Sequence, residues 1–163
     1  MKQRGFTLIE VLLVIAIIGV LLMVSYPNIK SSLEVRNLEN EAREILTTLQ
    51  QAKFQAVKTK LNHRITFDNT SGTWVYYLER EVQYNIWLEV PGYIRRSIPS
   101  KYTVTVSLPN QQCIYSPLGM VLNYSTSLNS ISIQNPTLSL QNQPSTRTIM
   151  TFAGGSVQYI KST

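Results

Sequence analysis

The sequence has few of the residues that catalysis and metal binding require. Its 163 residues include one Cys, and His63 and Asp68 are its only histidine and aspartate. One Cys excludes an intramolecular disulfide, a redox Cys-x-x-Cys pair and a cysteine zinc cage. A Ser-His-Asp triad would need both His63 and Asp68, but five positions apart on one strand they would point to opposite faces. We therefore expect no enzymatic activity, no metal site and no cofactor.

Charge is also scarce, except at the start of the chain. Charged residues make up 15% of the sequence, against about 25% in ordinary soluble domains. The first five residues contain Lys2 and Arg4, and the next nineteen are apolar, Gly or Thr except for Glu10. As a helix this run is roughly 28 Å long, about the thickness of the bilayer's hydrocarbon core. We expect residues 6–25 to span a membrane, with the N-terminus cytoplasmic and the rest of the chain outside the cytoplasm.

A secretory signal peptide explains this segment less well. The apolar run ends in Met23-Val24-Ser25-Tyr26-Pro27, which lacks the small-x-small pattern of a cleavage site. Glu10 would also be unusual in such a peptide, because a carboxylate at mid-bilayer costs on the order of 3 kcal/mol. Two interpretations of Glu10 stay open. It lies near the interface and remains hydrated, or it pairs with a cation, such as the α-amine of a neighbouring chain.

The residues Gly5-Phe6-Thr7-Leu8-Ile9-Glu10, after a short basic leader, resemble the class III signal of type IV pilins and pseudopilins. The resemblance implies that a prepilin peptidase cuts between Gly5 and Phe6 and that Phe6 is N-methylated. It places the spanning segment in the bacterial inner membrane, with the head periplasmic or otherwise outside the cytoplasm. It also implies that Glu10 pairs with the Phe6 amine of an adjacent subunit and sets the register of assembly. Gly19 and Pro27 stand where such proteins weaken and kink the helix.

Beyond Pro27 a one-faced helical pattern extends over residues 26–61. Proline lacks an N–H and disfavours helical geometry before it, which predicts a kink or brief break near Pro27. Ile29 and Leu33 are expected to extend the apolar stripe toward the N-terminus. The stripe should pack against the protein's own sheet. It consists of Leu38, Ala42, Ile45, Leu49, Ala52 and Ala56.

The period changes to two after Asn62, which predicts a β-rich head over residues 62–163. Strands are expected at 64–68 and 73–78 around a turn at 69–72, then at 82–90, 102–108, 112–115, 120–124 and 128–134. A last hairpin is expected at 148–152 and 157–160, with a long loop around 135–145. The fold class is therefore α+β: one long helix packed on an antiparallel sheet or sandwich.

This arrangement resembles the GspH/FimT family of minor pilins and pseudopilins more than the major pilins. The likeness in the head rests on the strand pair after the helix, on Ser116-Pro117-Leu118-Gly119 and on a glycine-centred C-terminal hairpin. The calcium loop of major pseudopilins has no counterpart, because Asp68 alone could not build one.

DNA binding is the alternative function. No acidic residue follows Glu89, whereas Arg95, Arg96 and Lys101 surround tyrosines that could stack on bases. Arg147 and Lys161 add positive charge. FimT-type proteins that bind DNA in natural transformation carry Gly-Arg-x-Arg near the C-terminus, but this stretch reads Gly155-Ser156-Val157-Gln158. The missing arginines make DNA uptake the second choice.

The stretch from 102 to 146 contains no charged side chain. It is either a polar outer face with loops or a neutral surface that docks other pilin heads. The sequence as a whole predicts a minor subunit of a type II secretion pseudopilus or a type IV pilus that helps to initiate or prime assembly. The expected partners are other pilin or pseudopilin subunits, the prepilin peptidase and N-methyltransferase, an inner-membrane assembly platform and membrane lipid.

Overall fold

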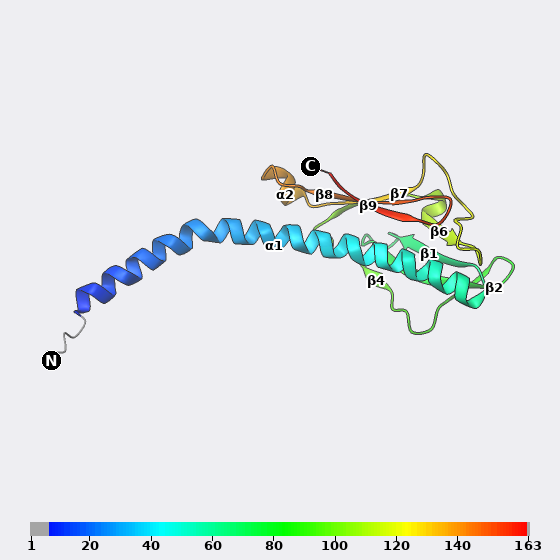
Figure 1. The fold of residues 1–163 in the computed structure, drawn as a ribbon, viewed down its shortest axis with the longest axis horizontal. Coiled ribbons are helices and arrows are strands. Elements are labelled where there is room, and N and C mark those ends of the chain that lie inside the picture. The colour runs from blue at the N-terminus through cyan, green and yellow to red at the C-terminus, as the bar shows by residue number, and fades with distance from the viewer. Residues whose placement is uncertain (1–6, 163) are drawn as a thin grey trace.

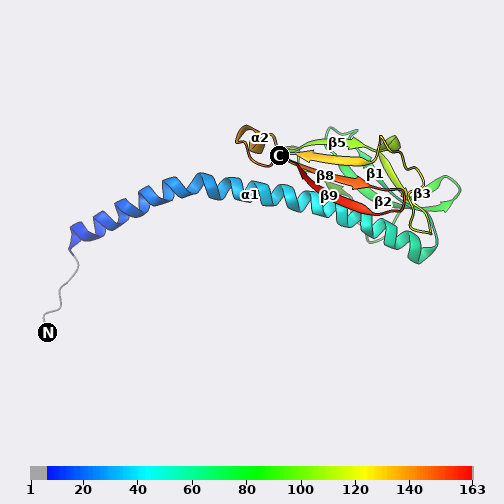
Figure 2. The same cartoon turned by 45° about the horizontal axis from the view of Figure 1, so that its top comes forward.

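One helix runs through a third of the chain and carries the β head on its C-terminal half (Figure 1). A computed structural model describes residues 7–162, and the side-chain surroundings of all of these except 24, 25, 27 and 28. The helix, α1, spans Leu8–Thr59. Its N-terminal half extends beyond the head, as Figures 1 and 2 both show.

The ends of α1 follow from local sequence. Thr7 is the N-cap, and the chain leaves the helix at Lys60, which adopts the left-handed conformation (φ 60°) and donates its N–H to the carbonyl of Ala56. The helix continues through Gly19 and Pro27, so the brief break expected near Pro27 is absent. The helix axis curves over its N-terminal half in Figure 1. That Gly19 and Pro27 cause this bend stays a prediction.

The head consists of two antiparallel sheets, which confirms the α+β class. The first sheet has the order β3-β2-β1-β6, with β4 also paired to β2, and the second has the order β5-β7-β8-β9. The first sheet contains β1 (His63–Asp68), β2 (Val75–Gln83), β3 (Ile86–Glu89), β4 (Arg96–Ser97) and β6 (Gln112–Tyr115). The second contains β5 (Thr103–Ser107), β7 (Ser130–Gln134), β8 (Thr146–Thr151) and β9 (Val157–Ser162). A 3-10 turn, η1 (Pro109–Gln111), and a short helix, α2 (Pro136–Leu140), complete the head.

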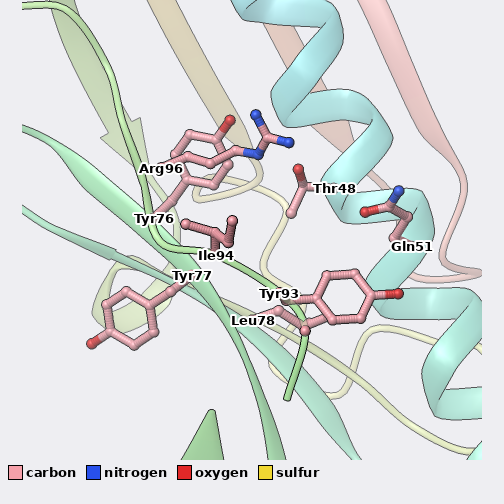
Figure 3. Close-up of a pocket in the computed structure, with 9 residues that line it drawn as sticks. Thr48, Gln51, Tyr76, Tyr77, Leu78, Tyr93, Ile94 and Arg96 are labelled. Atoms are coloured by element: carbon pink, nitrogen blue, oxygen red, sulfur yellow. The ribbon is translucent and has the colours of Figure 1, made fainter. Parts of the chain in front are cut away.

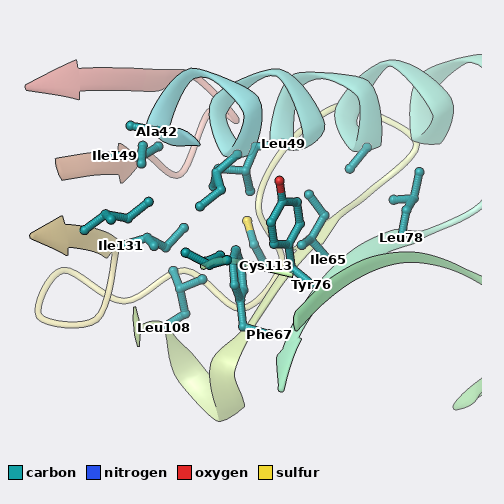
Figure 4. Packing of buried hydrophobic residues seen from close by; sticks show 14 of the residues in the cluster. Ala42, Leu49, Ile65, Phe67, Tyr76, Leu78, Leu108, Cys113, Ile131 and Ile149 are labelled. Carbon is teal, nitrogen blue, oxygen red and sulfur yellow. The ribbon is translucent and has the colours of Figure 1, made fainter. Parts of the chain in front are cut away.

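The predicted stripe of α1 forms one wall of the core. All six of its residues, from Leu38 to Ala56, are at most 1% exposed, and α1 packs chiefly on β1, β8 and β9. Figure 4 shows Ala42 and Leu49 above side chains from both sheets, among them Ile131 and Tyr76. Each fully buried Leu or Ile side chain contributes about 1.5–3 kcal/mol to folding, so Leu38, Ile45 and Leu49 fix α1 to both sheets.

Two expectations about apolar residues are wrong. Ile29 and Leu33 do not extend the buried stripe but are exposed, because in this part of α1 the head contacts a different face, where Lys101 and Asn135 meet Glu34. Residues 82–90 are not one strand. The chain reverses at Tyr84-Asn85, where Asn85 takes φ 60°, and β3 returns antiparallel along β2.

Two shorter segments also differ from expectation. Within 120–124, only Val121 pairs like a strand residue, through one bridge to Tyr115. Residues 135–145 contain α2 rather than a long loop. Asn135 caps α2 by accepting the N–H of Thr137, and the side chain of Leu138 is buried beneath it.

Candidate functional site

The first described turn of α1 is closed by Thr7 and Glu10. Glu10 Oε2 accepts from the Thr7 N–H (2.8 Å) and from Thr7 Oγ1 (2.9 Å), and the Glu10 N–H points back to Thr7 Oγ1 at 3.4 Å. This is a capping box, which satisfies N–H groups that have no partner within the helix. The sequence signal for this cap is the spacing Thr-x-x-Glu, which is typical of a helix N-terminus. Among the described residues, both contacts to the carboxylate fall on Oε2 and none on Oε1.

The predicted processing site cannot be placed. Gly5 and Phe6 lie outside the described residues, so cleavage and methylation there stay predictions. The apolar side chains from Leu8 to Met23 are exposed, because no part of the head reaches them. Among the residues that the structure describes, no helix combines the length and the apolar character needed to cross a membrane.

The cations predicted to contact nucleic acid are each paired with a carboxylate. Arg95 Nε donates to Glu89 Oε1 at 2.9 Å, and the Arg95 guanidinium also lies 4.3 Å from the ring centre of Tyr77. Arg95 holds the pKa of Glu89 below its usual value. Arg95 therefore connects the loop at 92–96 to Glu89 of β3 and Tyr77 of β2.

Arg96 and Lys101 are held by carboxylates of α1. Arg96 pairs with Glu44. Lys101 Nζ lies 2.9 Å from Glu34 Oε2, and Asn135 Nδ2 donates to the same oxygen at 3.2 Å. Lys101 is the main cause of the lowered pKa of Glu34. These pairs join positions 52 and 67 residues apart in the sequence, so no local pattern could reveal them.

Arg147, which was grouped with the surface cations, is buried. Its side chain is 1% exposed. Nη1 donates to the carbonyl oxygens of Thr146 (2.9 Å) and Pro144 (3.2 Å), and among the described residues Nε has no hydrogen-bond partner. No carboxylate within residues 7–162 forms an ion pair with it. Arg147 therefore fastens the segment before β8 and offers no phosphate contact at the surface.

A polar pocket of about 220 Å³ lies between α1 and the loop that contains Arg96. Figure 3 shows Arg96 near Thr48 and Tyr76 on one side, with Tyr93 and Gln51 on the other. The Tyr93 hydroxyl accepts from Gln55 Nε2 at 2.8 Å, so α1 also holds this end of the loop. Burial raises the pKa of Tyr76, whose hydroxyl stays protonated. The pocket contains no nucleophile paired with a base.

The other candidate residues lie apart from one another. His63 is buried on the inner face of β1, and Asp68 ends the same strand and accepts from the Thr70 N–H at 2.8 Å. Cys113 is buried in β6. Within residues 7–162, no group of three or more His, Cys, Asp or Glu side chains could hold a metal ion.

One long helix that carries two antiparallel sheets on its C-terminal half defines a pilin-like protein. Residues 1–26 match the prokaryotic N-terminal methylation motif. Residues 41–155 match the family described as type II transport protein GspH, and the chain belongs to that family.

The fold is also similar to that of the minor pseudopilin EpsH from the type 2 secretion system of Vibrio cholerae. The TM-score is 0.57 at 10% sequence identity, and the alignment covers 76% of this chain and 96% of EpsH. No curated protein matches the chain. The family match favours a type II secretion pseudopilin over a FimT-like DNA-binding pilin.

Proposed function

We propose that this protein is a minor pseudopilin, a structural subunit of a type II secretion pseudopilus that helps to initiate or prime filament assembly. The observation that carries the proposal is the GspH match over residues 41–155 in a chain whose first 26 residues match the methylation motif. The expected partners are other pseudopilin subunits and the enzyme that cleaves and methylates the N-terminus.

In this proposal residues 6–25 hold the subunit in the inner membrane, with the head on the periplasmic side. Cleavage after Gly5 makes Phe6 the new N-terminus, and methylation follows there. Glu10 has two roles. Through Oε2 it closes the first turn of its own helix with Thr7. Through Oε1 it accepts a hydrogen bond from the protonated Phe6 amine of a neighbouring subunit. Attraction between opposite charges is strong where water is excluded, so this pair sets the register of the subunits.

The experiment compares Glu10→Gln with Thr7→Ala in cells that assemble the pseudopilus. Glu10→Gln removes the charge and should leave the subunit in the membrane but absent from the sheared filament fraction. Thr7→Ala removes the N-cap hydroxyl, keeps the carboxylate and should still be incorporated. Equal incorporation of Glu10→Gln and the unaltered chain would refute the pairing.

Intact-mass analysis of the membrane-extracted protein tests the processing step separately. The mature chain should begin at methylated Phe6. A chain that retains Met1, or one cut after Ser25, would contradict the proposal.

A further inference from the structure

The end of the head farthest from the N-terminal half of α1 carries an open hollow of about 330 Å³. It forms where α1 ends and the β2–β3 hairpin projects past it. We call it the distal hollow; it is lined by Lys60, Leu61, Asn62, Glu81, Val82, Gln83, Tyr84 and Pro117. Leu61, Val82 and Tyr84 expose apolar surface there, and Tyr84 at the hairpin turn is 87% exposed. Large exposed apolar side chains that gather around one depression are typical of an interaction surface.

The only carboxylate in the lining is already used inside the head. Glu81 Oε2 accepts from Asn62 Nδ2 at 2.6 Å, and Glu81 Oε1 accepts from the Asn85 N–H at 2.8 Å. These two bonds connect the end of α1 to the hairpin turn and fix the shape of the hollow. Both carboxylate oxygens of Glu81 are therefore engaged within the head.

One rim residue of the hollow is cationic. Lys60 lines the hollow, and within the described chain it forms no ion pair. Arg95, Arg96 and Lys101, in contrast, all have carboxylate partners. The C-terminus of α1 favours nearby cations, which explains why a lysine is tolerated there but not why it borders an apolar depression.

We infer that the distal hollow docks another subunit of the same filament, through an apolar side chain of that subunit flanked by a carboxylate. The apolar side chain fills the depression, and a carboxylate beside it meets Lys60, because complementary charge gives such a contact its specificity. The hollow lies at the opposite end of the molecule from the segment proposed to sit in the membrane, so the docked subunit lies on the side away from the membrane. This inference rests on the proposed function.

A photo-cross-linking amino acid in place of Tyr84 tests the inference in cells that assemble the filament. The matched control site is Leu140 on α2, which is 88% exposed and lies at the other end of the head (Figure 1). Position 84 should cross-link to another filament subunit, in a segment that contains Asp or Glu. The change Lys60→Glu should lower that yield at least tenfold, whereas Lys30→Glu should not. Replacing the cross-linked Asp or Glu by Lys should restore the yield.

Several results would overturn the inference. These are no cross-link from position 84, a cross-link that charge reversal leaves unchanged, or adducts only with DNA, lipid or a secreted protein. In the same cells, the sheared filament fraction shows whether the protein is incorporated at all. Incorporation without the cross-link would refute this inference and leave the proposed function standing, and absence from the filament would refute both.

Discussion

Gly155 lies against Gly119 so closely that a Cβ atom on Gly155 would stand 1.8 Å from the carbonyl oxygen of Gly119. Gly155 belongs to the turn between β8 and β9, and Gly119 to the turn that follows β6. Lys53 of α1 covers the same contact, and its Nζ lies 3.4 Å from the carbonyl oxygen of Gly154. This contact joins the helix and the two sheets at one point, at the position where FimT-type proteins carry their Gly-Arg-x-Arg element.

Gly155→Ala should destabilise the protein by roughly 2–4 kcal/mol, because it combines a backbone clash with a left-handed φ of 71°. Urea unfolding of the intact chain in detergent, followed by tryptophan fluorescence, measures the change. The matched control is Gly154→Ala, since a Cβ there meets nothing within 4 Å. An equal loss of stability in Gly155→Ala and Gly154→Ala would contradict the close contact between Gly155 and Gly119.

The ion pairs of Arg95, Arg96 and Lys101 predict that these residues do not bind DNA. A phosphate would first have to displace Glu89, Glu44 or Glu34. The triple alanine variant should therefore change the affinity for duplex DNA less than twofold in a fluorescence-anisotropy titration against salt. Lys58→Ala with Lys60→Ala should weaken any non-specific binding more. If the triple variant lost DNA affinity tenfold, and the slope of log affinity against log salt concentration fell by about 3, the DNA-binding alternative would be restored.

The sequence predicted the parts of the fold that depend on local periodicity. The stripe from Leu38 to Ala56 repeats every three or four residues and is buried as expected. The hairpin at Tyr84-Asn85 was missed because apolar and polar residues keep alternating through the turn. Only the left-handed backbone of Asn85 reverses the chain there. The short helix α2 was signalled by Asn135-Pro136, a good N-cap followed by proline at the first helical position.

The candidate sites were harder to predict, because charge pairing is a property of the folded chain. The run without acidic residues after Glu89 indicated a basic surface, but the carboxylates that neutralise it come from α1. Glu44 and Glu34 are brought beside Arg96 and Lys101 only when the helix packs on the head. Lys58 and Lys60, at the C-terminal end of α1, form no ion pair within the described residues.

Cys113 should be unreactive in the folded protein. Burial raises the pKa of its thiol to about 12, so almost no thiolate is present near neutral pH. At pH 8 a maleimide should leave the folded chain unmodified for hours and should modify it within minutes in concentrated urea. Because the chain contains one Cys, mass spectrometry of the intact protein reads the result directly. Rapid modification without urea would show that β6 opens.

His63 should make the protein less stable in mild acid. Its side chain is 1% exposed, and its Nδ1 lies 3.1 Å from the carbonyl oxygen of Leu61, an arrangement that suits a neutral ring donating Nδ1–H. Burial, the largest cause, lowers the pKa of His63 below its usual 6.5. As the pH falls through 6.5, the unfolded chain binds a proton that the folded chain does not. The stabilisation present above pH 6.5 is therefore lost, at up to about 1.4 kcal/mol per pH unit.

His63→Gln keeps an N–H donor and removes the titrating group, so the comparison isolates this effect. Urea unfolding between pH 5 and 7 should show a weaker pH dependence in the variant than in the unaltered chain, whatever their difference at pH 7. Glu41 titrates in the opposite sense, because burial raises its pKa, but it contributes equally to both proteins. Because His63 is the only histidine, an equal dependence of the free energy of unfolding on pH in the two proteins would contradict this prediction. It would mean that the His63 ring is protonated within the fold and that a nearby acceptor takes its second N–H.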